Sequence, residues 1–352
     1  MTPLILINSL AVLLVYLSQY YNKTKYLYWG ALVMLCVFYG CRYDFGNDYW
    51  NYYNMFNNIG TNHDYDSNEP GWILLNHLCQ PIGFFGMIIV LSVFEYSTIF
   101  YFIRKYIIPQ YRWFAVFIFC FNFNFLWLGC SMMRQFLAMV ILLYAIEPIA
   151  KRNLIYFFII VGIAVSIHQT SVVFILTYIF AYWKPKINKP IFIIGFICAF
   201  IALMVVSKTY ISLFEIGYKL FQEDRFYDYL SWDQGNYTYT LAFDLLWLVL
   251  LMYYFPQNQY RKVICLISIV SYILLPFTYV LVLLSRLMLF FGIFYIFSVP
   301  TMFASIKQKP VRISLMLAYS ILMVKRSMDS LNGGTYGECY IYDSIFNAGG
   351  WM

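Results

Sequence analysis

Three arginines stand at the ends of long apolar runs: Arg42, Arg134 and Arg286. Arginine in or beside hydrocarbon is costly, and it usually faces a water-filled cavity or a partner. Its planar guanidinium suits two-point contact with phosphate. The three side chains therefore predict a pyrophosphate site, held by Arg134 and Arg286 with Arg42 assisting. In the alternative interpretation each arginine pairs with a nearby acid, as Arg42 would with Asp44.

His168 interrupts the apolar stretch 153–183, which begins and ends beside basic residues and must therefore go out and come back. Each arm has about 15 residues, roughly 22 Å of helix, which is short of a hydrocarbon core of about 30 Å. We expect the turn at His168 to lie below the outer surface, at the floor of a cavity. Helix-start residues follow it at 169–171 and favour an anion there. His168 can act as a general base or hydrogen-bond donor, or it can simply cap the turn.

The stretch Gly40–Phe56 sets Arg42, Asp44 and Asp48 among aromatic side chains. Charge in aromatic surroundings favours a ligand with charged groups and flat faces, such as a phosphorylated sugar lipid. Tyr and Trp also gather at membrane–water boundaries, so an ordinary interfacial loop is the alternative. Asp44, Asp48 and Glu69 are alternatives to His168 as base, or ligands of an acceptor sugar.

Composition indicates the surroundings of these residues. Of 352 residues, 62% are hydrophobic and 11% are charged, whereas soluble domains carry about 25% charged residues. The chain is therefore expected to be an all-α, polytopic membrane protein. We find no repeat or soluble linker, so residues 1–352 form one predicted domain, whose N-terminal apolar run is a spanning helix without signal-peptide features.

Apolar segments, most of them of roughly 15 to 20 residues, predict about twelve transmembrane helices, including the short re-entrant-like pair around His168. They fall near 3–21, 26–41, 84–103, 113–128, 130–148, 153–167, 169–183, 190–207, 241–255, 263–284, 287–305 and 313–324. Alternate loops are basic, which places them in the cytoplasm. The net charge of +7 is therefore a topology signal and not evidence for nucleic-acid binding.

The opposite set of loops is long, aromatic and mixed in charge: 42–83, 208–240 and the tail 325–352. We expect this outer face to be the active one, with both termini on it. Acids alternate with aromatic residues in 208–240, which suits sugar binding or a solvated amphipathic loop. Glu95 lies in the middle of an apolar helix, either as a functional acid or as a neutral hydrogen-bonded one. The three histidines lack metal-ligand spacing, so no metal site is expected.

Several motifs in order resemble the EpsG/Wzy-like polysaccharide polymerases of bacterial membranes. Arg42-Tyr-Asp-Phe-Gly46-Asn-Asp48-Tyr-x-x-Tyr52 is similar to the family's Arg-x-x-x-Gly-x-Asp-Tyr-x-x-Tyr loop. Glu69-Pro70-Gly71-Trp72, Arg134-Gln135-Phe-Leu-Ala138, His168-Gln-Thr-Ser171 and the Arg286 helix resemble its later elements. The tail departs from the pattern, because Cys339-Tyr340-Ile-Tyr342-Asp343 stands where Pro-Tyr is expected.

The resemblance implies a GT-C-like, inverting glycosyltransferase of the cytoplasmic membrane. It would join repeat units of an O-antigen, capsule or exopolysaccharide at the periplasmic or extracellular face. Its donor would be a glycan on undecaprenyl pyrophosphate, without metal, nucleotide or other cofactor, and its acceptor a single lipid-linked unit. Gln135, Tyr52 and Trp72 become sugar-binding candidates. Membrane lipid, a chain-length regulator and a flippase are implied partners, whereas nucleic acid is not. A flippase for the lipid-linked unit and a glycan ligase with the same donor remain alternatives.

Overall fold

A computed structural model of the chain describes residues 2–20, 25–59, 68–182, 194–195, 197–198, 238–278, 282–332 and 342–346. Almost all of these residues are helical. The α-helices are α1 (Thr2–Leu17), α2 (Lys25–Gly40), α3 (Tyr49–Asn58), α4 (Pro70–Cys79), α5 (Gly83–Tyr106), α6 (Arg112–Phe121), α7 (Leu126–Ser131), α8 (Met133–Leu142), α9 (Ile146–Lys151), α10 (Leu154–Ile167), α13 (Thr238–Tyr253), α14 (Gln259–Thr278), α15 (Val282–Gly292), α16 (Tyr295–Ser305) and α17 (Lys309–Asn332). Short 3₁₀ turns are η3 (Gln80–Ile82), η4 (Pro109–Tyr111) and η5 (Leu143–Ala145), and a longer 3₁₀ helix is η6 (Gln169–Ala181).

The apolar segments predicted from the sequence are largely helical where the structure describes them, which confirms the all-α class. About twelve full spans are not confirmed. Among the described residues, the runs Pro70–Tyr106 and Met133–Lys151 are long and apolar enough to cross a membrane. A third span results if Leu284–Gly292 and Tyr295–Ser305, bent by 52°, count as one. The number of full spans is lower than predicted because several apolar runs form helices of only 10–17 residues. The predicted segment 190–207 lies mostly outside the described residues.

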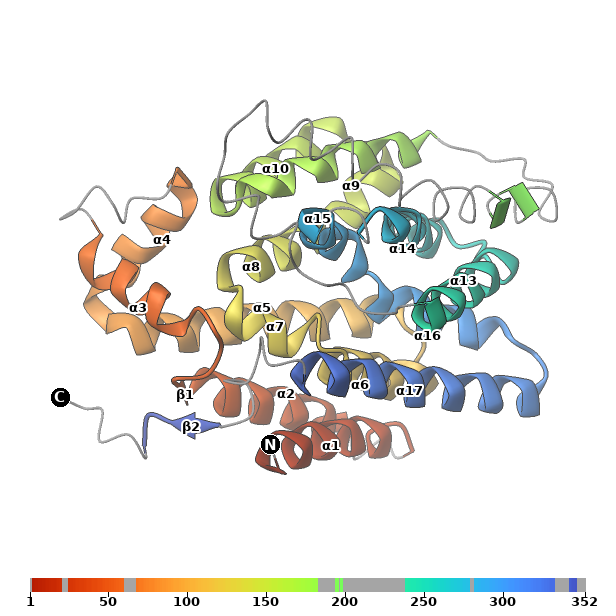
Figure 1. Ribbon diagram of the computed structural model, residues 1–352, viewed down its shortest axis with the longest axis horizontal. Helices are drawn as coiled ribbons and strands as arrows, with labels where there is room; N and C mark the ends of the chain where they lie inside the picture. Colours follow the sequence, from red (N-terminus) through yellow and green to blue (C-terminus); the bar gives the residue numbers. More distant parts are fainter. Residues whose placement is uncertain are drawn as a thin grey trace.

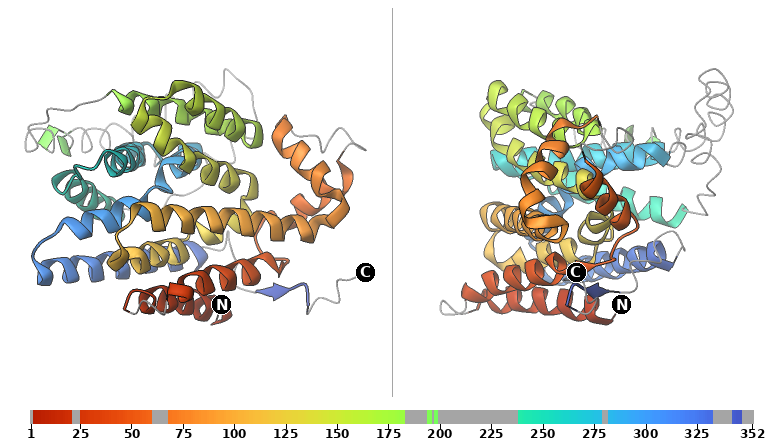
Figure 2. Two further views of the ribbon diagram at one scale, coloured as in Figure 1. Left: turned by 180° about the vertical axis from the view of Figure 1, so that it is seen from behind. Right: turned by 90° about the vertical axis from the view of Figure 1, so that its left-hand side faces the viewer.

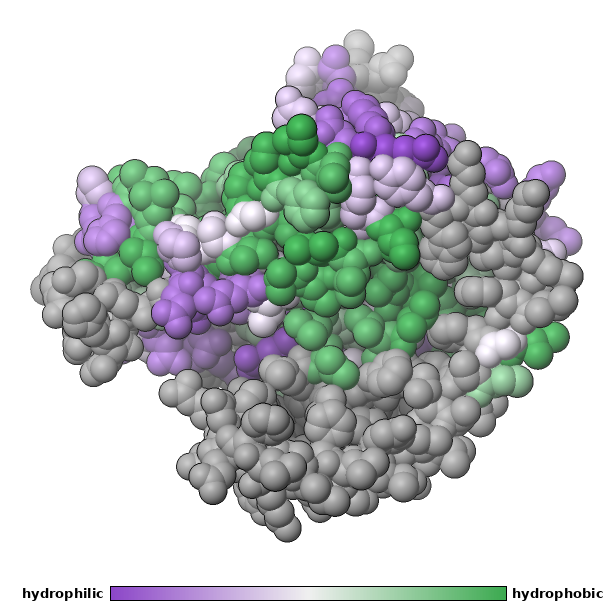
Figure 3. Space-filling model, turned by 90° about the horizontal axis from the view of Figure 1, so that it is seen from above, coloured by the Kyte–Doolittle hydropathy of each residue, from purple (hydrophilic) through white to green (hydrophobic). Residues whose placement is uncertain are grey.

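The long helices lie side by side in layers. In Figure 1, α1 and α2 form one edge, α10 lies at the opposite edge, and α8, α14 and α15 lie between them. Seen from behind in Figure 2, α5 crosses the whole molecule between these edges. Figure 3 looks down on the α10 side and shows a broad hydrophobic surface. The exposed side chains of α10 and η6 include Ile155, Ile159 and Leu176. Such a surface is suited to lipid.

The basic loops gather at one end of the bundle, as their alternation predicts. Arg261 donates to the carbonyl of Tyr106 at 3.0 Å, and Arg112 donates to that of Arg104 at 3.0 Å. Lys105 pairs with Glu147. For the loops that the structure describes, the grouping of the basic residues is therefore confirmed.

The opposite end holds the loop that follows α2. Gly46 has φ +110°, and a Cβ there would lie 2.7 Å from the carbonyl oxygen of Cys130, so this approach needs glycine. The amide of Asn47 donates to Ser131 Oγ at 3.2 Å. Strand β1 (Arg42–Tyr43) pairs antiparallel with β2 (Asp343–Ser344). The described part of the C-terminal tail therefore lies beside this loop, on the side where both were predicted.

Candidate functional site

Glu69 joins three segments that are far apart in the sequence. Its Oε2 accepts a hydrogen bond from Arg134 Nη1 at 2.6 Å. Its Oε1 accepts from His168 Nδ1 at 2.8 Å and from the amide of Gln169 at 3.1 Å. The Glu69 side chain is 8% exposed, whereas those of Arg134 and His168 are 27% and 22% exposed. We call Glu69, Arg134, His168 and Gln169 the Glu69 cluster.

The start of α4 carries Glu69 into place. Pro70 occupies the first helical position, where its missing amide hydrogen leaves no bond unmade, and Glu69 precedes it. One residue on, Gly71 packs against the last turn of α10, where a Cβ would lie 2.3 Å from Ser166 Oγ and 3.0 Å from the Ser166 carbonyl carbon. A residue without a side chain at 71 thus lets α4 approach closely enough for Glu69 to reach His168.

This contact gives a first prediction. Gly71→Ala should push α4 away from α10, destabilise the protein by about 1–3 kcal/mol as overpacked sites do, and lower activity by loosening the Glu69 cluster. Thermal unfolding in detergent and polymer formation in cells measure the two effects. Gly162→Ala in α10 is the matched control, because nothing lies within 4 Å of a Cβ there. Equal stability of the two variants would contradict the packing argument.

His168 ends α10 and begins η6 in an extended conformation, with φ −152° and ψ 111°. The predicted turn is therefore confirmed. The returning arm is a 3₁₀ helix whose buried residues Ser171, Phe174 and Thr177 recur every three positions, matching three residues per turn. The 3₁₀ helix rises about 2.0 Å per residue, so its 13 residues span roughly 26 Å. An α-helix with the same number of residues would be shorter.

The start of this second arm, where an anion is favoured, contacts the carboxylate of Glu69. The amide of Gln169 donates to Glu69 Oε1, and Gln169 Nε2 donates to the carbonyl of Asn68 at 2.8 Å. The ring of His168 stacks on Phe290 of α15, with 6.2 Å between centroids. The imidazole is thus held at one nitrogen by a carboxylate and on one face by an aromatic ring.

The charge state of Glu69 follows from its neighbours. Burial raises the pKa of Glu69, but the hydrogen bond from His168 and the charge of Arg134 outweigh it, so the pKa lies below its ordinary value of 4.5. A carboxylate with a lowered pKa is a weak base. Glu69 is therefore better suited to positioning Arg134 and His168 than to taking a proton itself.

The lowered pKa gives a second prediction. A carboxyl group whose pKa falls on folding stabilises the protein above its unfolded pKa and loses that contribution as pH falls through the folded value. The stability difference between wild type and Glu69→Gln should be constant above about pH 6 and should shrink below pH 4.5. Unfolding measured from pH 7 to pH 3 tests this. A difference that stays constant down to pH 3 would refute the assigned charge state.

The aromatic candidates have different positions. The Arg134 guanidinium lies over the ring of Tyr52 in α3, 5.8 Å from its centroid. Tyr52 in turn packs edge-on against Trp72 at 5.6 Å. Trp72 is completely buried, and its indole nitrogen donates to Met55 Sδ at 3.2 Å. A ring without exposed surface supports packing in this arrangement, and the sugar contact of Trp72 stays a prediction.

Gln135 and Arg286 meet through the backbone. Gln135 Nε2 donates to the carbonyl of Arg286 at 2.7 Å, which ties the start of α8 to α15. The Arg286 side chain is exposed. The two main arginine candidates thus come from adjoining segments. Gln135 is 3% exposed and links two helices, and its contact with a sugar stays a prediction.

Arg42 lies apart from the Glu69 cluster. It is buried, and its Nη1 donates to the carbonyl of Tyr39 at 2.8 Å and to Ser92 Oγ at 3.2 Å. No ion pair with Asp44 is recorded among the described residues; Asp44 is exposed, with φ +47°. The Arg42 guanidinium points inward toward α5, where Glu95 is also buried, and its contact with phosphate stays a prediction. Asp48 precedes α3, one turn before Tyr52.

Two residues that make close polar or packing contacts in the structure were not predicted from the sequence. Ser166 was not singled out, and no sequence signal marks it. Asp244, 7% exposed, pairs with Arg326 in a bidentate arrangement at 2.8 and 2.5 Å. An acid inside the apolar segment 241–255 is a signal of the kind that drew attention to Glu95, so Asp244 was recognisable. Within the described part of the chain, no three His, Cys, Asp or Glu side chains form a group that could hold a metal ion.

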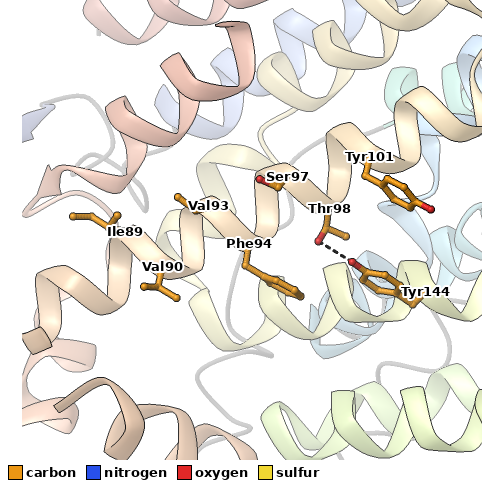
Figure 4. A pocket seen from close by; sticks show the side chains of 8 residues that line it. All are labelled: Ile89, Val90, Val93, Phe94, Ser97, Thr98, Tyr101 and Tyr144. Atoms are coloured by element: carbon orange, nitrogen blue, oxygen red, sulfur yellow. Dashed lines mark hydrogen bonds between the residues drawn. The ribbon is translucent and has the colours of Figure 1, made fainter. Parts of the chain in front are cut away.

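A separate groove of about 570 Å³ runs along α5 (Figure 4). It is lined by Ile89, Val90, Val93, Phe94, Ser97, Thr98, Tyr101 and Tyr144. Its polar groups include Thr98 and Tyr144, whose hydroxyls lie 3.3 Å apart. The groove can accommodate hydrocarbon, but it contains none of the charged groups that a transfer reaction needs.

Comparison with known proteins adds the family. The model of the EpsG family matches residues 6–338, a range that includes every member of the Glu69 cluster. No curated protein and no solved structure matches the chain.

Proposed function

We propose, from the premise that the chain belongs to the EpsG family, that it is an inverting polysaccharide polymerase whose reaction takes place at the Glu69 cluster. The family supports a membrane protein with a polymerase-type role in polysaccharide biosynthesis. In the proposed reaction, a glycan on undecaprenyl pyrophosphate is transferred to a lipid-linked repeat unit. The outer face of a bacterial cytoplasmic membrane is the proposed location.

The observation that supports this role most strongly is the bridge formed by Glu69 between His168 and Arg134. A carboxylate can only accept hydrogen bonds, so His168 Nδ1 carries the hydrogen of their 2.8 Å contact. In a neutral imidazole the other nitrogen, Nε2, then has a free lone pair. The pairing thus prepares a base beside a guanidinium, which is what transfer from a pyrophosphate requires.

The reaction follows from these groups. An acceptor hydroxyl oxygen attacks the anomeric carbon of the donor glycan, and His168 Nε2 takes the hydroxyl proton. The bond between the anomeric carbon and the pyrophosphate oxygen breaks, and its electron pair leaves with the lipid pyrophosphate. Arg134, together with Arg286 at the edge, stabilises the negative charge of the leaving group. Attack opposite to the leaving group inverts the anomeric centre.

A glycan ligase with the same donor is the second candidate. It would use the same base and the same guanidinium, so the Glu69 cluster does not separate the two activities. A flippase needs polar groups along a path open to both sides. Within the described residues, the charged groups of the cluster contact one another at a single place, which favours a transferase.

Purified protein incubated with a lipid-linked repeat unit tests the proposal. A ladder of products that differ by one unit is expected without added metal or nucleotide. In cells, deletion should remove the ladder and leave single capped units. Polymer that persists but stays on its carrier would identify a ligase, and accumulation of units on the inner face would identify a flippase. A chain-length regulator and the flippase itself are the proposed neighbours of the enzyme.

A further inference from the structure

A second polar site lies away from the Glu69 cluster. It is a cavity of about 490 Å³ between α13, α17, α15 and the turn that joins α6 to α7. Asp244, Lys325, Arg326 and Asp329 bring charge to it, and Asn122 and Asn124 bring amides. Its volume is in the range of small-molecule sites, roughly 300–1,000 Å³.

The ion pair in the cavity is held in a fixed geometry. The two terminal nitrogens of Arg326, Nη1 and Nη2, donate to Oδ1 and Oδ2 of Asp244, and the guanidinium lies 5.5 Å from the ring centroid of Phe243. The next residue, Ser327, donates to the carbonyl of Phe121 at 2.7 Å and accepts from the amide of Phe123 at 3.0 Å. The pair is therefore fastened to the α6–α7 turn.

A structural strut would account for the ion pair alone, but not for its surroundings. Asp244 and Arg326 neutralise each other, so packing would not need the further charges of Lys325 and Asp329 around an open volume. Ionisable residues in membrane helices usually face a water-filled cavity or a pathway. This one also has the rings of Tyr272, Tyr295 and Tyr319 in its wall.

The mixture of groups identifies the ligand class. Carboxylates accept hydrogen bonds from hydroxyls, guanidinium and amide groups donate to ring and hydroxyl oxygens, and aromatic faces cover the C–H faces of a sugar. Leu275, Met288 and Met323 are the aliphatic side chains of the lining, whereas its other apolar surface comes from aromatic rings. A saccharide satisfies this set of partners better than a hydrocarbon chain or a bare phosphate does.

The cavity and the Glu69 cluster share one helix. Phe290 of α15 stacks on His168, whereas Met288 of the same helix lines the cavity. Two residues separate the side chains by about 200° around a helix that turns once in about 3.6 residues. The two sites therefore lie on opposite faces of α15, about one helix diameter of roughly 10–12 Å apart.

The cavity also lies far from the basic end. Arg312, near the start of α17, lies among the basic loops, and 14 residues of helix at about 1.5 Å each place Arg326 roughly 21 Å from it. The neighbouring turn is linked to the end of α2, because Asn8 donates to the carbonyl of Cys120 and accepts from the hydroxyl of Tyr39. The cavity is thus toward the end of the bundle that carries the loop after α2.

We propose that this cavity binds the sugars of the acceptor, the single lipid-linked unit, while the donor pyrophosphate lies at the Glu69 cluster. This inference rests on the proposed polymerase function, since a reaction between two lipid-linked saccharides needs two places to hold them. Asp244 and Arg326 then contact the repeat unit directly, with Lys325 at the rim.

The test measures acceptor use separately from turnover. Purified protein in nanodiscs receives carrier-linked polymer as donor and increasing amounts of labelled single units, extracted from a strain that lacks the polymerase. The readout is the label that enters polymer. The variants are Asp244→Asn, Arg326→Gln and Ser330→Trp, the last of which fills the cavity from an exposed position that lines it. Ala318→Trp, at an exposed position of α17 outside the cavity, is the matched control.

We expect KM for the single unit to rise roughly tenfold to a hundredfold, as when a ligand loses one charge-assisted hydrogen bond. The maximal rate should remain near that of wild type, and the control should behave as wild type. An unchanged KM in Ser330→Trp, with wild type active, overturns the cavity assignment and leaves the polymerase function standing. This holds even if the ion-pair variants do not fold. Wild type that transfers no label at all would instead refute the proposed function, and the inference with it.

Discussion

Replacing His168 with alanine should abolish most polymer formation, lowering the rate by about 10²- to 10⁴-fold, the contribution typical of a general base. The loss should be in the maximal rate, because the lone pair at Nε2 acts only when the acceptor proton is removed. Gel analysis of the polymer in cells and label transfer by the purified variant measure it.

The control for this substitution is in α4. His77 is also a histidine, but its side chain is exposed at the last turn of that helix, away from Glu69. His77→Ala should therefore keep normal polymer. If His168→Ala made polymer of normal length and amount, the assignment of the base would be wrong, whatever the family implies.

Substitution of Arg134 is expected to have the second large effect on the reaction rate. Arg134→Gln should lower the rate by about 10²- to 10³-fold, as expected when one group that stabilises developing negative charge is removed. Arg134→Lys should recover part of the activity, because it keeps the charge but loses the planar fork. Label transfer at saturating donor and acceptor measures both variants.

Two comparisons separate this role from simple structural support. Arg104→Gln, an arginine of the basic end that stacks on Trp29 at 5.4 Å, should retain activity. In the double variant Glu69→Gln with Arg134→Gln, the losses should be far from additive, because residues in one hydrogen-bonded network act as a unit. Losses that simply add would indicate that Glu69 and Arg134 act independently, against the arrangement around Glu69.

The residues around Gly71 explain why these predictions centre on Glu69. From the sequence, Glu69 was one of three alternative bases beside Asp44 and Asp48. In the structure, the close approach of α4 to Ser166 brings Glu69 to His168 and Arg134. The role that we propose for it changes accordingly from a base to a positioning residue.

Much of the architecture was determined by the sequence itself. The long apolar runs had to become helices, because backbone groups in hydrocarbon must be satisfied internally, and alternating charge had to sort the loops to two ends. The turn at His168 followed from chain length, since 31 apolar residues between basic loops have to reverse direction. These signals are local, and they required no knowledge of which helices are neighbours.

Pairings across long separations were decided by tertiary structure alone. Arg134 has no acid in its own segment, yet it meets Glu69 across 65 residues, and Arg326 meets Asp244 across 82. Arg42 looked equivalent to Arg134 in the sequence, but packing turned it inward to Tyr39 and Ser92. A one-dimensional pattern specifies which residues are costly to bury. Only the packing of helices decides which partner offsets that cost, and therefore which arginine remains beside His168.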